Sequence, residues 1–175
     1  MRKDFQKRKI FIGSLVLLMI GYLLWTQRPV TVFWAGSPVE NEPVMISEQF
    51  VNQDRRFEIY GIVVNHFPLT EWGRIHWYLD HKEELKKKYG IPLSYSYRIT
   101  FWDIGSGFTD VKTSGDSDLY CFPLKKETDK HCIEKNMFMN VEYDAGSYER
   151  FAFSSSEYYW ITMPDGKLAR IKNAL

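Results

Sequence analysis

The chain has almost no net charge, and this absence excludes one class of function. Its 175 residues include 23 basic and 22 acidic side chains, which leaves a net charge of +1 at pH 7. Five of the basic residues fall within residues 1–9, so the rest of the chain is mildly acidic. Proteins that bind nucleic acids carry a basic patch or stripe that neutralises phosphates. We therefore expect no nucleic-acid partner.

The sequence also lacks the short motifs that identify common catalytic or cofactor sites. There is no G-x-S-x-G nucleophile elbow, and residues 105–107 (GSG) are not followed by the lysine of a phosphate loop. Asp116 and Asp118 begin like a calcium loop, but its later glycine and glutamate are missing. His76 and His81 are five residues apart and cannot share one face of a helix to hold a metal. The sequence therefore assigns no catalytic, cofactor-binding or metal-binding residue.

One long run without charge stands near the N-terminus, at residues 10–27. At about 1.5 Å per residue a helix of this length reaches about 27 Å, close to the thickness of a bilayer core. The pair of small residues that precedes a signal-peptide cleavage site is missing. Tyr22 and Trp25 fall at the far end of the run, where amphipathic rings favour the headgroup zone. We predict an uncleaved transmembrane anchor at residues 10–27.

The basic residues predict which way this anchor points. Residues 1–9 hold five basic residues and one acidic residue, whereas the other flank has Arg28 followed by Glu40 and Glu42. Basic residues flanking a membrane span favour the cytoplasmic side. We expect residues 1–9 to be a cytoplasmic tail and the chain after the anchor to lie outside that membrane.

Cysteine is scarce, since the chain contains only Cys121 and Cys132. In an oxidising compartment, this pair would form a disulfide that closes a short loop and contributes about 3 kcal/mol by the chain-entropy estimate. Two free thiols, or a metal site that adds His131, are the alternatives. A zinc site normally has a close CxxC pair and a fourth ligand, which this stretch lacks.

The remaining sequence alternates between short strand-like runs and one helix. Thr70 can cap a helix that Gly90 and Pro92 end, with apolar residues along one face. Strand-like runs of β-branched and aromatic residues occupy residues 29–34, 57–67, 95–104, 119–124, 137–145, 148–154, 158–163 and 168–173. We predict an α+β fold in which one principal amphipathic helix packs on a small antiparallel β-sheet.

Aromatic residues, at 17 % of the chain, are the most prominent feature of the composition. Many of them belong in the core, but a sheet packed on one helix has a second face that is open. Aromatic rings exposed there would form a binding surface for a protein or a sugar polymer. The candidate surface residues are Trp72, His76, Trp77, Tyr158, Tyr159 and Trp160.

Several stretches resemble one known family. They are the basic tail with the anchor and RPV, then NHFPLTEWGRIHWYLDHKEELKKKYGIP, ITFWDIGSGF, LYCF with the later HCIEKN, and DGKLARIKN. Together they resemble the enterobacterial membrane proteins grouped as domain of unknown function 943, over nearly the whole chain. The resemblance implies a single-span inner-membrane protein with a small periplasmic domain, and it supplies no activity. The predicted organisation is a cytoplasmic tail (1–9), an anchor (10–27), a first strand and tether (28–56) and a periplasmic α+β domain (57–175).

Three functional classes remain open at this point. The first is a non-catalytic protein-binding domain, such as an immunity-type factor against a delivered toxin. The second is an envelope hydrolase or modifying enzyme, which would require two or more of four residues to converge in a cleft. Those residues are His66, Asp103, His131 and Glu142. The third is an accessory subunit of an envelope complex.

Overall fold

The computed structural model describes residues 11–21, 28–37, 57–92, 96–116, 118–123 and 130–173. The chain divides into two compact units, Met1–Val30 and Thr31–Leu175.

In the first unit, residues 11–21 are helical and their apolar side chains are exposed. Among the described residues, no helix combines the length and the apolar character needed to cross a membrane. The rest of the predicted anchor, including Tyr22 and Trp25, lies outside the described residues, and so does the tail at residues 1–9.

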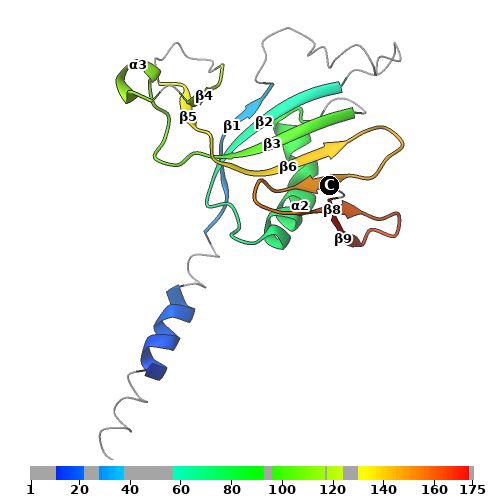
Figure 1. The fold of residues 1–175 in the computed structure, drawn as a ribbon, viewed down its shortest axis with the longest axis horizontal. Coiled ribbons are helices and arrows are strands. Elements are labelled where there is room, and N and C mark those ends of the chain that lie inside the picture. Colours follow the sequence, from blue (N-terminus) through cyan, green and yellow to red (C-terminus); the bar gives the residue numbers. More distant parts are fainter. Residues whose placement is uncertain are drawn as a thin grey trace, which may run out of the picture. The chain divides into compact units, whose positions relative to one another are not determined.

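The second unit is built on a seven-stranded sheet in the order β1-β2-β3-β6-β7-β8-β9 (Figure 1). Its strands are β1 (Thr31–Gly36), β2 (Phe57–Asn65), β3 (Ser96–Asp103), β6 (Met137–Tyr143), β7 (Arg150–Ala152), β8 (Tyr158–Thr162) and β9 (Leu168–Lys172). Neighbouring strands run antiparallel except β2 and β3, which are parallel. The prediction of an antiparallel sheet is therefore wrong for this pair. The reason is that helix α2 (Glu71–Tyr89) connects the two strands and carries the chain back to the end where β2 began.

Helix α2 has the ends that the sequence predicts. Thr70 accepts a hydrogen bond from the backbone N–H of Gly73 at 3.0 Å, and Gly90 ends the helix in the left-handed conformation, with φ 70°. Ile75, Tyr78 and Leu85 on the predicted apolar face are buried. The expected principal helix is thus confirmed.

Alternate residues of the central strands face α2 and form the main core. Phe67, just after β2, stacks on Phe101 of β3 with ring centroids 5.1 Å apart, and Tyr78 of α2 packs edge-on against Phe101 at 6.0 Å. Other strand residues in this layer have no exposed surface: Ile62, Val64, Ile99, Met139, Val141 and Phe151. Because strand side chains alternate between faces, the intervening residues point to the opposite side of the sheet.

A hairpin covers part of that opposite face. It consists of β4 (Leu119–Cys121) and β5 (Cys132–Glu134), and a short helix, α3 (Val111–Ser114), precedes it (Figure 1). A disulfide joins Cys121 to Cys132, so the predicted bridge is present. The hairpin and the sheet share a second core that contains Val63, Ile104, Phe122 and Ile133. The sequence prediction missed β5 and α3.

Close approach of aromatic rings in this second core depends on a glycine. A Cβ atom on Gly61 would lie 3.0 Å from Cζ3 of Trp34 and 3.2 Å from Cε1 of Phe122. Trp34 belongs to β1, which pairs with β2 at one edge of the sheet. The first predicted strand is therefore part of the same sheet, and residues 38–56 of the predicted tether lie outside the described residues.

Candidate binding site

Three of the six predicted surface residues meet at the start of α2. The centroid of the Trp72 ring lies 4.1 Å from that of His76 and 5.7 Å from that of Trp160. Trp72 and His76 are one helical turn apart, and β8 places Trp160 beside that turn. Trp72 is 52 % exposed, so its ring is held by neighbours yet open to solvent.

Two charged residues hold this cluster together. The indole N–H of Trp160 donates to Oε2 of Glu71 at 2.8 Å, and the guanidinium of Arg170 lies 3.8 Å from the same oxygen. The Arg170 guanidinium also covers the Tyr158 ring, 4.4 Å from its centroid. We name this group the Trp72 patch; it consists of Glu71, Trp72, His76, Tyr158, Trp160 and Arg170.

The other two predicted surface residues lie elsewhere. Trp77 packs against Phe67, with ring centroids 5.3 Å apart, and stacks on His81 at 4.5 Å. Tyr159 points to the opposite face of the sheet from Trp160, where its ring lies 4.2 Å from the guanidinium of Arg150. Neither residue therefore contributes to the Trp72 patch.

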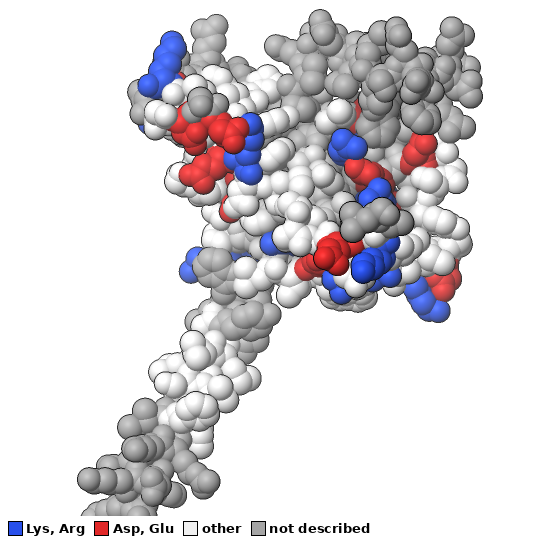
Figure 2. Space-filling model, in the orientation of Figure 1, with Lys and Arg blue, Asp and Glu red and all other residues white. Residues whose placement is uncertain are grey.

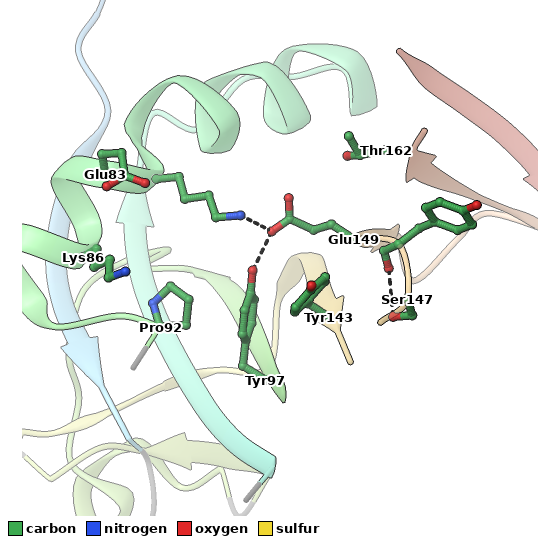
Figure 3. Close-up of a pocket in the computed structure, with 10 residues that line it drawn as sticks. Glu83, Lys86, Pro92, Tyr97, Tyr143, Ser147, Glu149 and Thr162 are labelled. Carbon is green, nitrogen blue, oxygen red and sulfur yellow. Dashed lines mark hydrogen bonds and ion pairs between the residues drawn. The ribbon is translucent and has the colours of Figure 1, made fainter. Parts of the chain in front are cut away.

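A pocket of about 580 Å³ lies beside the C-terminal half of α2 (Figure 3). Glu149, which is 8 % exposed, lines it. Oε1 of this carboxylate accepts hydrogen bonds from Tyr97 at 2.6 Å, Lys82 at 2.8 Å and Tyr78 at 2.9 Å. The Lys82 ammonium and the two hydroxyls compensate the cost of burying the carboxylate.

The two tyrosines are held in their neutral form as donors. Burial raises the pKa of Tyr78 above its usual value, and the negative charge of Glu149 raises it further. The same two causes, in the same order, raise the pKa of Tyr97. Both hydroxyls therefore keep their protons well above neutral pH and continue to donate to Glu149.

Two of the four residues on which an enzymatic role was predicted to depend, Glu142 and Asp103, lie far apart. Glu142 in β6 pairs with Arg98 of β3 at 2.9 Å. Asp103 lies five residues after Arg98 on the same strand, which corresponds to about 17 Å at about 3.3 Å per residue. His66 follows β2, and His131 lies beside the disulfide. None of these four residues lines the Glu149 pocket.

One sequence family matches almost the whole chain. Its description is "Enterobacterial putative membrane protein (DUF943)", and the match covers residues 5–172. The chain belongs to this family. No curated protein and no solved structure matches the chain. The family resemblance inferred from the sequence is therefore confirmed, and it describes a membrane protein without assigning an activity.

In this family member, the charges are mixed rather than segregated. Figure 2 shows Lys and Arg side chains interspersed with Asp and Glu over the visible face of the domain. This mixture agrees with the net charge of +1. Among the described residues on this face, Figure 2 shows no broad patch of one sign that would attract a polyanion.

One group of possible metal ligands lies close together in the described part of the chain. The side-chain ligand atoms of Cys121, His131 and Cys132 are within 4.8 Å of one another. Zinc binds cysteine as the thiolate, and both sulfur atoms here are joined in the disulfide. This group is therefore not a metal site in its oxidised form.

Sequence reasoning missed the Glu149 pocket altogether. Glu149 lies 52 residues from Tyr97, 67 from Lys82 and 71 from Tyr78 along the chain. No local spacing relates Glu149 to any of these residues. The one local signal is a glutamate directly before the short strand β7, and glutamate is most often found at the surface.

Proposed function

We propose that this chain is a single-pass inner-membrane protein whose folded domain stands in the periplasm and binds a protein partner through the Trp72 patch. Membership of a membrane-protein family supports the location, together with the uncharged residues 10–27 and the basic residues before them. The disulfide between Cys121 and Cys132 supports an oxidising compartment, because such bonds persist outside the cytoplasm.

The exposure of Trp72 on a rigid support is the observation that carries this proposal. Trp72 is 52 % exposed although its ring packs against both His76 and Trp160. Protein interfaces concentrate their binding energy in a few tryptophan, tyrosine and arginine residues. A ring that is already fixed loses little conformational entropy when a partner covers it.

The partner we favour is a toxin delivered by a neighbouring bacterium, which would make this protein an immunity-type factor. A small tethered domain with one aromatic contact surface suits that task. Membrane attachment would raise the local concentration of the domain where a toxin arrives. The separation of Glu142 from Asp103, and the absence of all four candidate catalytic residues from the lining of the Glu149 pocket, favour binding over an enzymatic role.

Survival beside toxin-producing neighbours tests this proposal. Cells without the protein should survive less well than wild type, and cells with Trp72→Ala should resemble cells without it. Val111→Ala is the matched control, because Val111 is 42 % exposed on α3 and lies outside the Trp72 patch. Immunoblots should show equal amounts of both variants in the membrane fraction.

Two results would contradict the proposal. One is equal survival of cells with and without the protein beside every toxin-producing strain. The other is full protection by Trp72→Ala at normal abundance, because truncation of a central aromatic contact typically weakens binding by at least about tenfold.

A further inference from the structure

The Glu149 pocket is separate from the Trp72 patch. Lys82 and Lys86 line the pocket and lie ten and fourteen residues after Trp72 on α2, which corresponds to about 15 to 21 Å along the helix. A cavity of about 580 Å³ is within the range of small-molecule sites, about 300 to 1,000 Å³. A ligand could therefore occupy it while a protein covers Trp72.

The charges that line the pocket balance one another. Lys82 is paired with Glu149 at 2.8 Å, and Glu83 and Lys86 bring one further charge of each sign. Glu83 would repel an anionic ligand that Lys86 attracts. Likewise, Lys86 would repel a cationic ligand that Glu83 attracts. The lining therefore favours a ligand without net charge.

Two hydrogen-bonding atoms of the residues that line the pocket are not used by the described part of the protein. The three hydrogen bonds to the Glu149 carboxylate all reach Oε1, and none of them uses Oε2. Oγ1 of Thr162 is buried and has no hydrogen-bond partner among the described residues. The backbone N–H of Thr162 donates to the carbonyl of Glu149 at 3.0 Å, so the two residues are neighbours across β7 and β8. Buried polar atoms are normally paired, so an unpaired hydroxyl beside an acceptor suits a ligand with both donors and acceptors.

Tyrosine rings provide the remaining contact surface. Tyr148 is among the residues that line the pocket and is 50 % exposed. Tyr143 lines the pocket from the end of β6 (Figure 3). Tyrosine combines a flat apolar face with a polar hydroxyl at its end. A sugar ring has the matching form, because its C–H groups form a flat face and its hydroxyls project from the rim.

We propose that the Glu149 pocket binds a neutral sugar unit of a glycan. The sugar ring stacks on Tyr148. One sugar hydroxyl donates a hydrogen bond to Oε2 of Glu149, and a neighbouring sugar hydroxyl forms a hydrogen bond with Oγ1 of Thr162. The buried ion pair of Lys82 and Glu149 holds the carboxylate in place without giving the site a net charge.

Saturation-transfer NMR on the full chain in lipid nanodiscs tests this assignment, since many detergents carry sugar headgroups. The probes are the neutral disaccharides of glucose, galactose and N-acetylglucosamine, with glucosamine, glucuronate and glycylglycine as charged comparisons. We expect at least one neutral disaccharide to bind in a saturable way and more tightly than the charged probes.

Two variants locate the binding. Thr162→Val keeps the shape of the side chain and removes a hydroxyl that bonds to no group in the described part of the chain, so the fold is retained and sugar affinity falls about fivefold to tenfold. Tyr148→Ala removes a half-exposed ring and lowers the affinity by a similar factor. Thr31→Val, on an exposed threonine in β1, is the control and leaves the affinity unchanged.

Three outcomes would overturn the assignment. The first is that no neutral disaccharide shows saturable binding. The second is that a charged probe or the dipeptide binds more tightly than every neutral sugar. The third is that sugar binding is undiminished in both Thr162→Val and Tyr148→Ala. Because the assay does not involve Trp72, each of these results leaves the proposed protein-binding role standing.

Discussion

The Glu149 carboxylate gathers one ammonium group and two tyrosine hydroxyls on a single oxygen. Both tyrosines are almost wholly buried, Tyr78 at 0 % and Tyr97 at 4 % exposure. Ionisation of either hydroxyl would place a second negative charge beside Glu149 in a poorly solvated position. The cluster is therefore stable only while both tyrosines keep their protons.

This requirement predicts a loss of stability at alkaline pH. Tyrosines in the unfolded chain ionise near pH 10, whereas burial and Glu149 raise the pKa of Tyr78 and Tyr97 in the folded protein. Above about pH 10 the folded form thus binds more protons than the unfolded form. Each of the two tyrosines then lowers the free energy of unfolding by about 1.4 kcal/mol per pH unit until its folded-state pKa is reached.

Urea unfolding at several pH values above 10 measures this loss. Tyr97→Phe removes one of the two groups and should make the decline with pH shallower by about 1.4 kcal/mol per unit. Tyr159→Phe, on the other face of the sheet, is the matched control and should retain the wild-type slope. Equal slopes for wild type and Tyr97→Phe would contradict the account.

At the scale of elements, local sequence signals predicted the ends of α2 but not its consequence for the sheet. Thr70 and Gly90 mark the helix ends because capping depends on nearby residues alone. The parallel pairing of β2 with β3 depends on how a long connection returns the chain, which no strand pattern encodes. The short β5 was missed because three residues, Cys132–Glu134, are too few to show a periodic pattern.

The hairpin of β4 and β5 should owe its stability to the disulfide. The bridge closes a segment in which the cysteines are 11 positions apart, and such a loop contributes about 3 kcal/mol. We expect the double variant Cys121→Ser with Cys132→Ser to lower the Tm by about 6 to 12 °C. Circular dichroism during heating measures this change.

A reducing agent provides the control for the hairpin experiment. It should lower the Tm of the wild type by a similar amount and leave the Tm of the double variant unchanged. Trp34 and Phe122 lie 4.5 Å apart in the second core, so tryptophan fluorescence should change along with the Tm. An unchanged wild-type Tm after complete reduction would show that the hairpin is held by its apolar contacts alone.

At the scale of the whole molecule, the proposed location connects features that are far apart in the sequence. In the proposed topology, outward transfer of the domain would bring Cys121 and Cys132 to an oxidising compartment, where a disulfide persists. The same transfer would leave residues 1–9, with five basic residues, on the cytoplasmic side. Topology and disulfide state should therefore change together.

Reporter fusions after Leu175 test this coupling. Alkaline phosphatase should be active there and green fluorescent protein should not fluoresce, because the first requires export and the second folds in the cytoplasm. Replacing the five basic residues of the tail with glutamine should invert a fraction of the molecules, since those charges set the orientation. In the inverted fraction both cysteines should react with alkylating reagents, whereas in the wild type neither should react. A bright fluorescent fusion with two reactive thiols in the wild type would place the domain in the cytoplasm and overturn the proposed location.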